Sequence, residues 1–329
     1  MSETVPPTID DIRAAAVRIA PHLHHTPLLG SHSLSKLTGY KLSFKCENLQ
    51  KTGSFKPRGA VNRIATLDPD AANRGIITIS AGNHAQGVAY AAARLGIKAF
   101  VVMPETAVAS KVEATRGYGA ECILHGDVHS AFEKLQEVQQ EKGLTLVHPF
   151  DDPMLIAGQG TVGLELLEKD GAPFDAVVVG VGGGGLIAGV ATALSSLAPE
   201  TRVFGVEPEG AATMTLALAA GSVVRLDDLN TIADGLAPPF VGELNLAVVE
   251  HLVESVVRVT DIEIRYAMAL LLERMKLLVE PAGAAALAAL MNGKIPVERG
   301  TRVAVILSGG NVDVQRLAEL LPGHKQSPA

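Results

Sequence analysis

The sequence predicts an α/β protein built on mainly parallel β-sheets with helices on both faces. Two observations carry this prediction: short runs of β-branched residues recur along the 329 residues, and helical stretches separate them. An apolar fraction of 47% is ample for a large core, and the length suggests two domains or one large one.

The predicted elements alternate along the chain. Strands are predicted at 42–46, 76–79, 99–103, 121–124, 176–179, 203–206 and 303–307. Helices are predicted at 86–95, 110–116, 130–141, 262–278 and 282–291. In such folds ligands bind beyond the carboxyl ends of the strands, so three glycine-containing loops that directly follow strands are expected to face one crevice.

Charge and cysteine content exclude several classes of protein. A net charge of −7 without a basic run argues against nucleic acid as the main partner. Cys46 and Cys122 lie far apart and without metal-ligand spacing, which fits a reducing compartment. The N-terminal residues lack the basic and apolar regions of a signal peptide, so a cytoplasmic protein is expected.

One uncharged stretch, 176–199, is long enough to span a bilayer. Four glycines at 182–185 interrupt it, after a β-branched run and before an apolar helical segment. The pattern therefore predicts a buried strand, a phosphate-binding loop and a buried helix, not a membrane span.

Lys56 is the residue with the most telling surroundings, because Phe55, Pro57 and Gly59 flank it. A lysine in an apolar pocket can lose its proton and act as a nucleophile or a base. Taken alone, a solvated lysine near a helix start is the simpler interpretation. The glycine loops further along the chain favour the interpretation of Lys56 as a nucleophile or a base.

The four consecutive glycines Gly182, Gly183, Gly184 and Gly185 offer free backbone N–H groups at a helix start, which suits a phosphate. The same region also matches the dinucleotide pattern G-x-G-x-x-G, with Glu207 at the end of the next strand. An NAD-dependent oxidoreductase is therefore a rival, although one such match is a weak signal. A turn without any ligand is the structural alternative.

The loop Ser80, Ala81, Gly82, Asn83 and His84 follows the strand at 76–79 and opens a helix. Its free amides suit a carboxylate, and an asparagine side chain can bond a ring hydroxyl. A simple helix N-cap by a serine or asparagine is the alternative.

Ser308 follows the buried strand at 303–307. Its hydroxyl is neutral, so it can bond a pyridine nitrogen without protonating it, whereas an aspartate would keep the ring cationic. A Ser-Gly-Gly turn with no ligand is the alternative.

Taken together, these motifs resemble the fold-type II pyridoxal-phosphate enzymes, and most closely the threonine/serine dehydratases (threonine ammonia-lyases), which are related to serine racemases. The resemblance covers roughly 8–320. Its motifs are Ser-Phe-Lys-Pro-Arg-Gly-Ala at 54–60, Ser-Ala-Gly-Asn-His-Ala-Gln-Gly at 80–87, His-Pro-Phe-Asp-Asp-Pro at 148–153, Ala-Gly-Gln-Gly-Thr at 157–161, Val-Gly-Gly-Gly-Gly-Leu at 181–186, Ala-Asp-Gly at 233–235, Glu-Pro-Ala-Gly-Ala at 280–284 and Ser-Gly-Gly-Asn at 308–311.

The resemblance implies a two-domain fold like that of the tryptophan synthase β-subunit. A smaller α/β domain at 75–151 is expected to be inserted into a larger cofactor-binding domain formed by 1–74 and 152–321, and 322–329 is expected to be a disordered tail. A homodimer or homotetramer is also implied. The chain stops soon after 308–311, so no C-terminal regulatory domain and no isoleucine feedback through one are expected.

The resemblance also implies site roles. Lys56 would carry pyridoxal 5'-phosphate as a Schiff base and later act as the base at the substrate Cα, with Phe55 against the ring. Asn83 would bond the ring hydroxyl and Ser308 the ring nitrogen. The remaining positions would bind the cofactor phosphate, at Gly182, Gly183, Gly184, Gly185 and Leu186, or the substrate carboxylate, at Ser80, Ala81, Gly82 and His84.

Two departures narrow the choice within the family. Racemases carry a second serine where this chain has Ala81, and they tend to have asparagine where Phe150 stands, so a dehydratase is favoured over a racemase. Relatives with a divalent-cation site bind the cation through a glutamate after the strand, a backbone carbonyl and an aspartate a few residues on. Glu207 and Ala211 match the first two ligands, but Thr213 stands in place of the aspartate. One carboxylate weakens such a site, so no metal is assigned, and Glu207 is kept as the one candidate ligand.

The sequence thus predicts β-elimination from L-threonine or L-serine, giving a 2-oxo acid and ammonia. Within the family, a 3-hydroxyaspartate or other β-hydroxy amino acid dehydratase and a serine racemase stay open. Outside it, an NAD oxidoreductase and a catalytically silent amino-acid sensor stay open.

Overall fold

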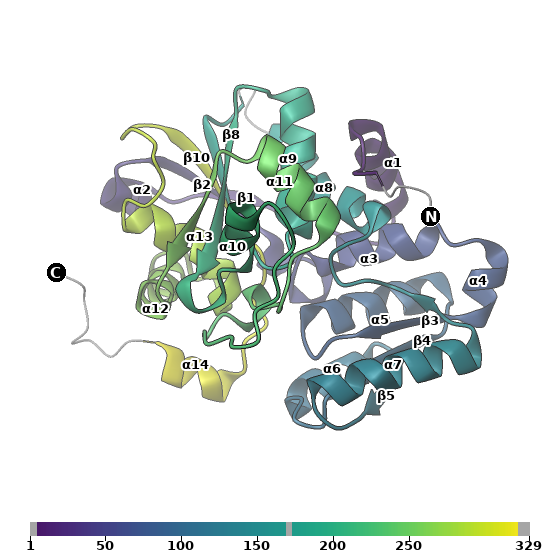
Figure 1. Cartoon of the computed structure of the whole chain (residues 1–329). Helices are drawn as coiled ribbons and strands as arrows, with labels where there is room; N and C mark the ends of the chain where they lie inside the picture. Colours follow the sequence, from purple (N-terminus) through teal and green to yellow (C-terminus); the bar gives the residue numbers. More distant parts are fainter. Residues whose placement is uncertain (1–4, 169–172, 322–329) are drawn as a thin grey trace.

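The computed structural model describes residues 5–168 and 173–321, so the predicted disordered tail at 322–329 lies outside the described residues. The described chain forms two β-sheets with helices packed against them, and the smaller sheet lies at the lower right of Figure 1. This arrangement confirms the predicted α/β class.

The larger sheet has the order β1-β2-β10-β7-β8-β9. Its strands are β1 (Leu28–Gly30), β2 (Lys41–Cys46), β7 (Ala176–Gly180), β8 (Arg202–Pro208), β9 (Ser255–Val259) and β10 (Arg302–Leu307). All neighbours are parallel except β1 and β2, which are antiparallel. Because β7 and β10 are neighbours, the glycine loop and Ser308 leave the same edge of the sheet.

The smaller sheet is wholly parallel, in the order β5-β4-β3-β6. Its strands are β3 (Ile76–Ile79), β4 (Ala99–Met103), β5 (Glu121–Leu124) and β6 (Thr145–Leu146). All of them fall within the segment 75–151 that the sequence analysis assigns to an inserted domain, whose boundaries stay a prediction.

Helices surround both sheets (Figure 1). They are α1 (Ile9–Ile19), α2 (His32–Thr38), α3 (Lys56–Ala65), α4 (Pro69–Arg74), α5 (Asn83–Leu95), α6 (Ala109–Gly117), α7 (Val128–Lys142), α8 (Pro153–Leu167), α9 (Gly185–Leu197), α10 (Thr213–Ala220), α11 (Glu243–Leu252), α12 (Asp261–Leu270), α13 (Pro281–Met291) and α14 (Val314–Leu320).

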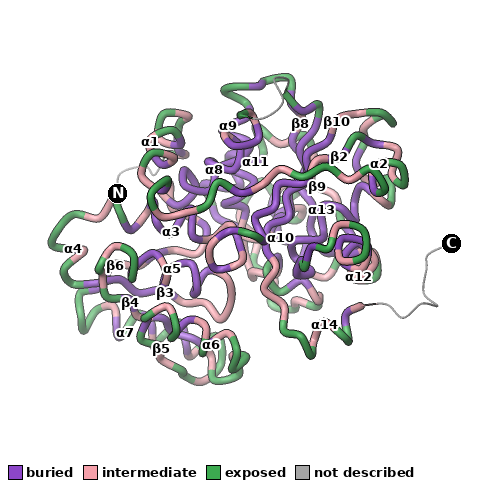
Figure 2. The backbone as a smooth tube through the Cα atoms, turned by 180° about the vertical axis from the view of Figure 1, so that it is seen from behind, coloured by how far each residue is buried: buried purple, intermediate pink, exposed green. Residues whose placement is uncertain are grey.

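Both faces of the larger sheet are buried, as near-continuous apolar strands require. Along β10, Val303 and Val305 pack with residues of α12 and α13, whereas Ala304 and Ile306 pack with residues of α9 and α11. The buried colour in Figure 2 accordingly follows the central strands and the helices against them.

The seven predicted strands are all present, but the helix predicted at 262–278 is shorter. After α12 the chain makes a π-helical turn over Leu271–Met275 and stops at Lys276, which has a φ of +61°. The amide of Leu277 then donates to the carbonyl of Leu271 at 3.3 Å. A left-handed residue with such a bond ends a helix, and lysine gives no sequence signal for it.

The uncharged stretch 176–199 forms β7, the glycine loop and α9, as predicted. Among the helices of the described chain, none is both long enough and apolar enough to cross a bilayer.

Candidate active site

Loops from the ends of three strands come together around the start of α3. The amide of Phe55 donates to the carbonyl of Ser308 at 3.1 Å, which ties the Lys56 segment to the end of β10. Asn83, the first residue of α5 after the loop that follows β3, bonds Glu280 and Asn311 at 2.6 and 2.9 Å. The sequence-predicted residues from different loops therefore lie close together.

Lys56 is the first residue of α3, and its Nζ donates to the carbonyl oxygen of Pro149 at 3.0 Å. The Nζ also lies 5.2 Å from the centre of the Phe55 ring. Burial lowers the pKa of Lys56 to about 8, although the charge of Glu280 acts in the opposite direction. Above this pKa the amine is neutral and, held by one carbonyl, keeps its lone pair free, so this lysine is suited to nucleophilic attack on an aldehyde.

This pKa predicts a pH dependence for the cofactor-free protein. The rate at which Lys56 reacts with an added aldehyde should rise with pH and level off above about 8, because only the neutral amine is nucleophilic. The rate of appearance of the absorption band after mixing with pyridoxal phosphate measures it. A rate still rising through pH 10 would show that Lys56 has an ordinary lysine pKa.

The glycine loop has the shape of an anion cradle. Gly184 has a φ of +92°, a conformation that suits glycine, and α9 starts at the next residue. A Cβ on Gly183 would lie 2.2 Å from a ring carbon of Phe150, so no larger residue fits there. Within the described chain, no protein acceptor bonds the amides of 182–186. Free amides at the start of a buried helix fit a phosphate.

Two residues outside the sequence-predicted site hold this loop. The Nδ2 of Asn245, a fully buried residue, donates to the carbonyls of Phe150 and Gly183 at 2.9 and 2.7 Å. The carboxylate of Asp151 accepts from the amides of Glu243 and Leu244 and so caps α11. The motif at 148–153 thus links Lys56, through the carbonyl of Pro149, to the glycine loop, through Phe150 and Asn245.

The loop between β3 and α5 keeps the features of a carboxylate site. Gly82 is the N-cap and supplies no side-chain cap, and its amide donates to Ser80 Oγ at 3.1 Å. In the described part of the chain, the amides of Asn83, His84 and Ala85 have no acceptor. The cap that the sequence offered as the alternative use of Ser80 or Asn83 is therefore not formed, and the amides stay free for an anion.

The ring of His84 points into the smaller sheet. Its Nε2 lies 3.0 Å from Thr78 Oγ1 and 3.2 Å from the carbonyl of Val147. Burial, followed by the charge of Lys56, lowers the pKa of His84 well below its ordinary value. The ring is therefore neutral, so only the amide of His84, which has no acceptor among the described residues, is open to a carboxylate.

Ser308 is 5% exposed, and its hydroxyl has no partner among the residues described. Its carbonyl is already used by Phe55. A nearly buried hydroxyl without a protein partner fits a ring nitrogen, which accepts one hydrogen bond.

Glu280 is a further buried group at the site that is not among the site residues predicted from the sequence. Its Oε1 accepts from Asn83 Nδ2 at 2.6 Å. Burial raises the pKa of Glu280 to about 7, although the Asn83 hydrogen bond and Lys111 act to lower it. Its place in the motif at 280–284 was the only signal in the sequence that could have indicated Glu280 as a site residue.

Glu207, the candidate metal ligand, has both carboxylate oxygens in use. They accept from the amides of Met214 and Thr215 at 2.6 and 2.9 Å and from the Thr215 hydroxyl at 2.7 Å. Within the described ranges, no group of three or more His, Cys, Asp or Glu residues lies together as metal ligands would. The carboxylate thus caps the start of α10.

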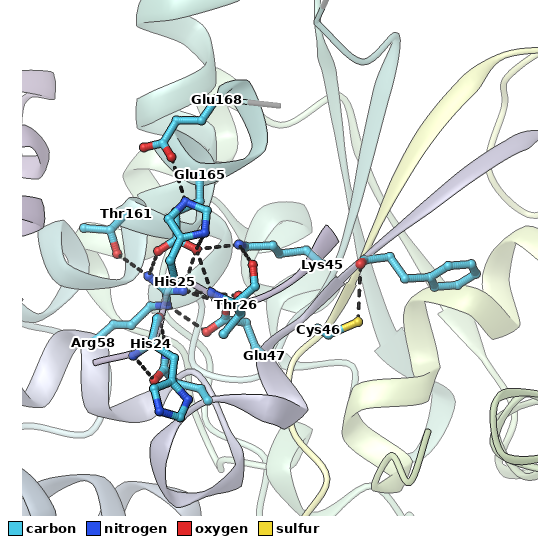
Figure 3. A network of polar contacts seen from close by, with 12 residues as sticks. His24, His25, Thr26, Lys45, Cys46, Glu47, Arg58, Thr161, Glu165 and Glu168 are labelled. Atoms are coloured by element: carbon cyan, nitrogen blue, oxygen red, sulfur yellow. Dashed lines mark hydrogen bonds and ion pairs between the residues drawn. The ribbon is translucent and has the colours of Figure 1, made fainter. Parts of the chain in front are cut away.

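A buried ionic network lies behind Lys56, two residues along α3 (Figure 3). Arg58 donates to Glu47 through Nε at 2.7 Å and to Glu165 through Nη1 at 2.5 Å. Lys45 donates to the same Glu165, and Thr161 accepts from Arg58 at 3.1 Å. The network fixes the start of α3 to β2 and α8.

Comparisons with known proteins agree with this geometry. The family model described as "Pyridoxal-phosphate dependent enzyme" matches residues 19–309. An L-threonine ammonia-lyase of Thermotoga maritima is 45% identical over 95% of this chain and 78% of that protein. An L-threo-3-hydroxyaspartate ammonia-lyase of a Pseudomonas species is 41% identical over 95% of this chain and 98% of that protein. The solved structure of maize serine racemase has a TM-score of 0.91 and 43% identity, and covers 95% of this chain and 96% of its own.

Proposed function

The chain belongs to the family of pyridoxal-phosphate dependent enzymes, and on that basis we propose that it dehydrates and deaminates L-threonine and L-serine. The products are 2-oxobutyrate or pyruvate, together with ammonia. The observation that carries the proposal is Lys56, a lysine with a pKa lowered to about 8 at the junction of three strand-end loops. Membership in this family also replaces the NAD oxidoreductase as an interpretation of the glycine loop.

The residues present fit pyridoxal phosphate on three counts. The free amides of 182–186 suit its phosphate, the unpartnered hydroxyl of Ser308 suits its ring nitrogen, and Lys56 suits its aldehyde. When bound, pyridoxal phosphate supplies an electron sink for the charge that develops at the substrate Cα.

The protein's own groups then orient the substrate and move its proton. The free amides at the start of α5 are suited to hold the substrate carboxylate. As an amine with a lowered pKa, Lys56 is suited to take the proton from Cα. Because a serine hydroxyl does not protonate the ring nitrogen, Ser308 favours prompt loss of the β-hydroxyl over a long-lived carbanion.

Racemisation requires a second group that delivers a proton to the opposite face of Cα. Ala81 occupies the loop position at which a second serine is expected in racemases, and a methyl group transfers no proton. This difference supports a lyase even though a serine racemase is among the similar structures.

Replacing Ala81 with serine should therefore raise racemase activity. We expect L-serine incubated with Ala81→Ser to yield D-serine at about ten or more times the wild-type rate, because a general acid contributes at least that much. Chiral chromatography measures it, with Ala72→Ser, at a half-buried alanine of α4, as the matched control. Equal D-serine formation by both variants would argue against the position of Ala81 as the reason.

The proposed activity is tested by 2-oxo acid release from purified protein supplied with pyridoxal phosphate. L-Threonine, L-serine and L-threo-3-hydroxyaspartate are compared side by side. Rapid 2-oxobutyrate formation supports the proposal. Activity on hydroxyaspartate alone would favour the alternative that the Pseudomonas relative represents. Cofactor binding without turnover of any substrate would favour a sensor.

We also place the enzyme in the cytoplasm as a homodimer or homotetramer. Both cysteines are free thiols, and Cys46 is buried, which suits a reducing compartment. Light scattering on the purified holoenzyme tests the assembly, and a monomer at micromolar concentration would contradict it.

A further inference from the structure

A directed chain of hydrogen bonds runs through the amide of Asn83. Asn311 Nδ2 donates to the backbone carbonyl of Thr52 at 2.6 Å and to Asn83 Oδ1 at 2.9 Å. Asn83 Nδ2 in turn donates to Glu280 Oε1 at 2.6 Å. The chain joins groups that are far apart in sequence, since 228 residues separate Asn83 from Asn311 and 197 separate it from Glu280.

The donor and acceptor of each of these bonds follow from the chemistry of the groups that meet. The carbonyl of Thr52 can only accept, so the NH₂ group of Asn311 must face it. The second hydrogen of that group then points at Asn83 and requires its oxygen there. The NH₂ group of Asn83 consequently faces Glu280, and one of its two hydrogens stays uncommitted.

The backbone around this chain leaves little room for another arrangement. Thr52 has a φ of +61°, which is rare for a β-branched residue, and it presents its carbonyl to Asn311. A Cβ on Gly53 would lie 2.4 Å from Asn311 Oδ1, and one on Gly309 would lie 2.3 Å from Glu280 Oε1. Both glycines thus allow the polar side chains to approach the loops that carry Lys56 and Ser308.

We propose that Asn311 and Glu280 are positioning residues that hold the Asn83 amide with one N–H free for the ring hydroxyl of the cofactor. This inference rests on the proposed function, because it assumes a cofactor ring beside Lys56 and Asn83. A donor fixed at that oxygen favours its ionised form, so the chain would set the absorption of the bound cofactor as well as its affinity.

The test is a double-mutant cycle on cofactor binding. Cofactor-free protein is titrated with pyridoxal phosphate, and both the dissociation constant and the position of the visible band are recorded. We expect Asn83→Ala and Asn311→Ala each to weaken binding about tenfold, the value of one charge-assisted hydrogen bond, and to shift the band in the same direction. The double variant should bind no more than about twofold more weakly than Asn83→Ala, because Asn311 acts through Asn83.

Two near-isosteric variants sharpen the test. Asn311→Asp has no donor for Thr52 or Asn83, so it should shift the band as Asn311→Ala does. Glu280→Gln keeps an oxygen that can accept from Asn83, so it should retain the wild-type band. Thermal unfolding of each cofactor-free variant confirms that it folds. The double-mutant cycle and the near-isosteric variants test the role of the hydrogen-bond chain independently of each other.

Fully additive losses in the cycle, or a wild-type band in both Asn311 variants, would overturn the proposal while leaving the lyase intact. A wild-type band in Asn83→Ala would do the same. Failure of the wild-type protein to form any band at Lys56 would instead overturn the proposed function, and this inference with it.

Discussion

Lys56→Ala should lower 2-oxobutyrate release from L-threonine by about three orders of magnitude or more. The side chain has two roles in the proposed reaction, as the amine that holds the cofactor and as the base at Cα. Alanine supplies neither, and the buried amine of Lys45 is already committed to the carbonyl of Thr26 and to Glu165. Cofactor bound by the variant should be removable by gel filtration after borohydride treatment, whereas the wild-type protein should keep it covalently.

Two further variants separate chemistry from folding. Lys56→Arg keeps the positive charge but cannot lose a proton, so it should be as inactive as Lys56→Ala. Lys41→Ala, at an exposed position at the start of β2, should keep wild-type activity. Because Lys56 makes a single hydrogen bond to Pro149, the cofactor-free variants should unfold within a few degrees of wild type. Substantial turnover by Lys56→Ala would remove this residue from the mechanism.

Much of the site could be predicted because its pieces are local. The predicted chemistry of each piece follows from its neighbours in the sequence, as at Lys56, the glycine loop and Ser308. The glycine loop and Ser308 each follow an apolar strand. The order of strands and loops along the chain is then enough to predict that these loops meet, since neighbouring parallel strands bring their carboxyl ends to one edge of the sheet.

The rest could not be predicted because its partners are distant in sequence. Asn245 bonds the carbonyl of Phe150 across 95 residues, and Arg58 bonds Glu165 across 107. No periodicity links such pairs. The sequence also placed His84 at the substrate carboxylate without revealing that its ring turns toward Val147. Motifs predict where a residue lies more reliably than where its side chain points.

The second large effect expected is on stability, at Arg58. This residue is fully buried, and so is Glu47, while Lys45 is 1% and Glu165 9% exposed. Burial raises the pKa of Glu165, but the hydrogen bonds and charges of Arg58 and Lys45 outweigh it and hold that pKa below its ordinary value. Two cations and two carboxylates thus balance one another away from water (Figure 3).

Arg58→Met should lower the free energy of unfolding by about 3–5 kcal/mol, because it leaves two carboxylates facing one lysine in a buried site. Denaturant titration of the cofactor-free protein measures the loss. The penalty should shrink as the pH falls, since protonation removes the uncompensated carboxylate charge. Activity should fall as well, because the network fixes the start of α3, where Lys56 lies.

We expect the loss of stability in Arg58→Met to come from unbalanced buried charge and not from lost packing alone. The double variant Glu47→Gln/Arg58→Met leaves Lys45 paired with Glu165, so it should recover more than half of the loss. Arg13→Met breaks an exposed pair with Asp10 and should change the unfolding free energy by less than about 1 kcal/mol. A double variant no more stable than Arg58→Met would show that the cost comes from the cavity and the packing of the arginine stem. The network would then stabilise the base of α3 by shape, and its four charges would contribute little.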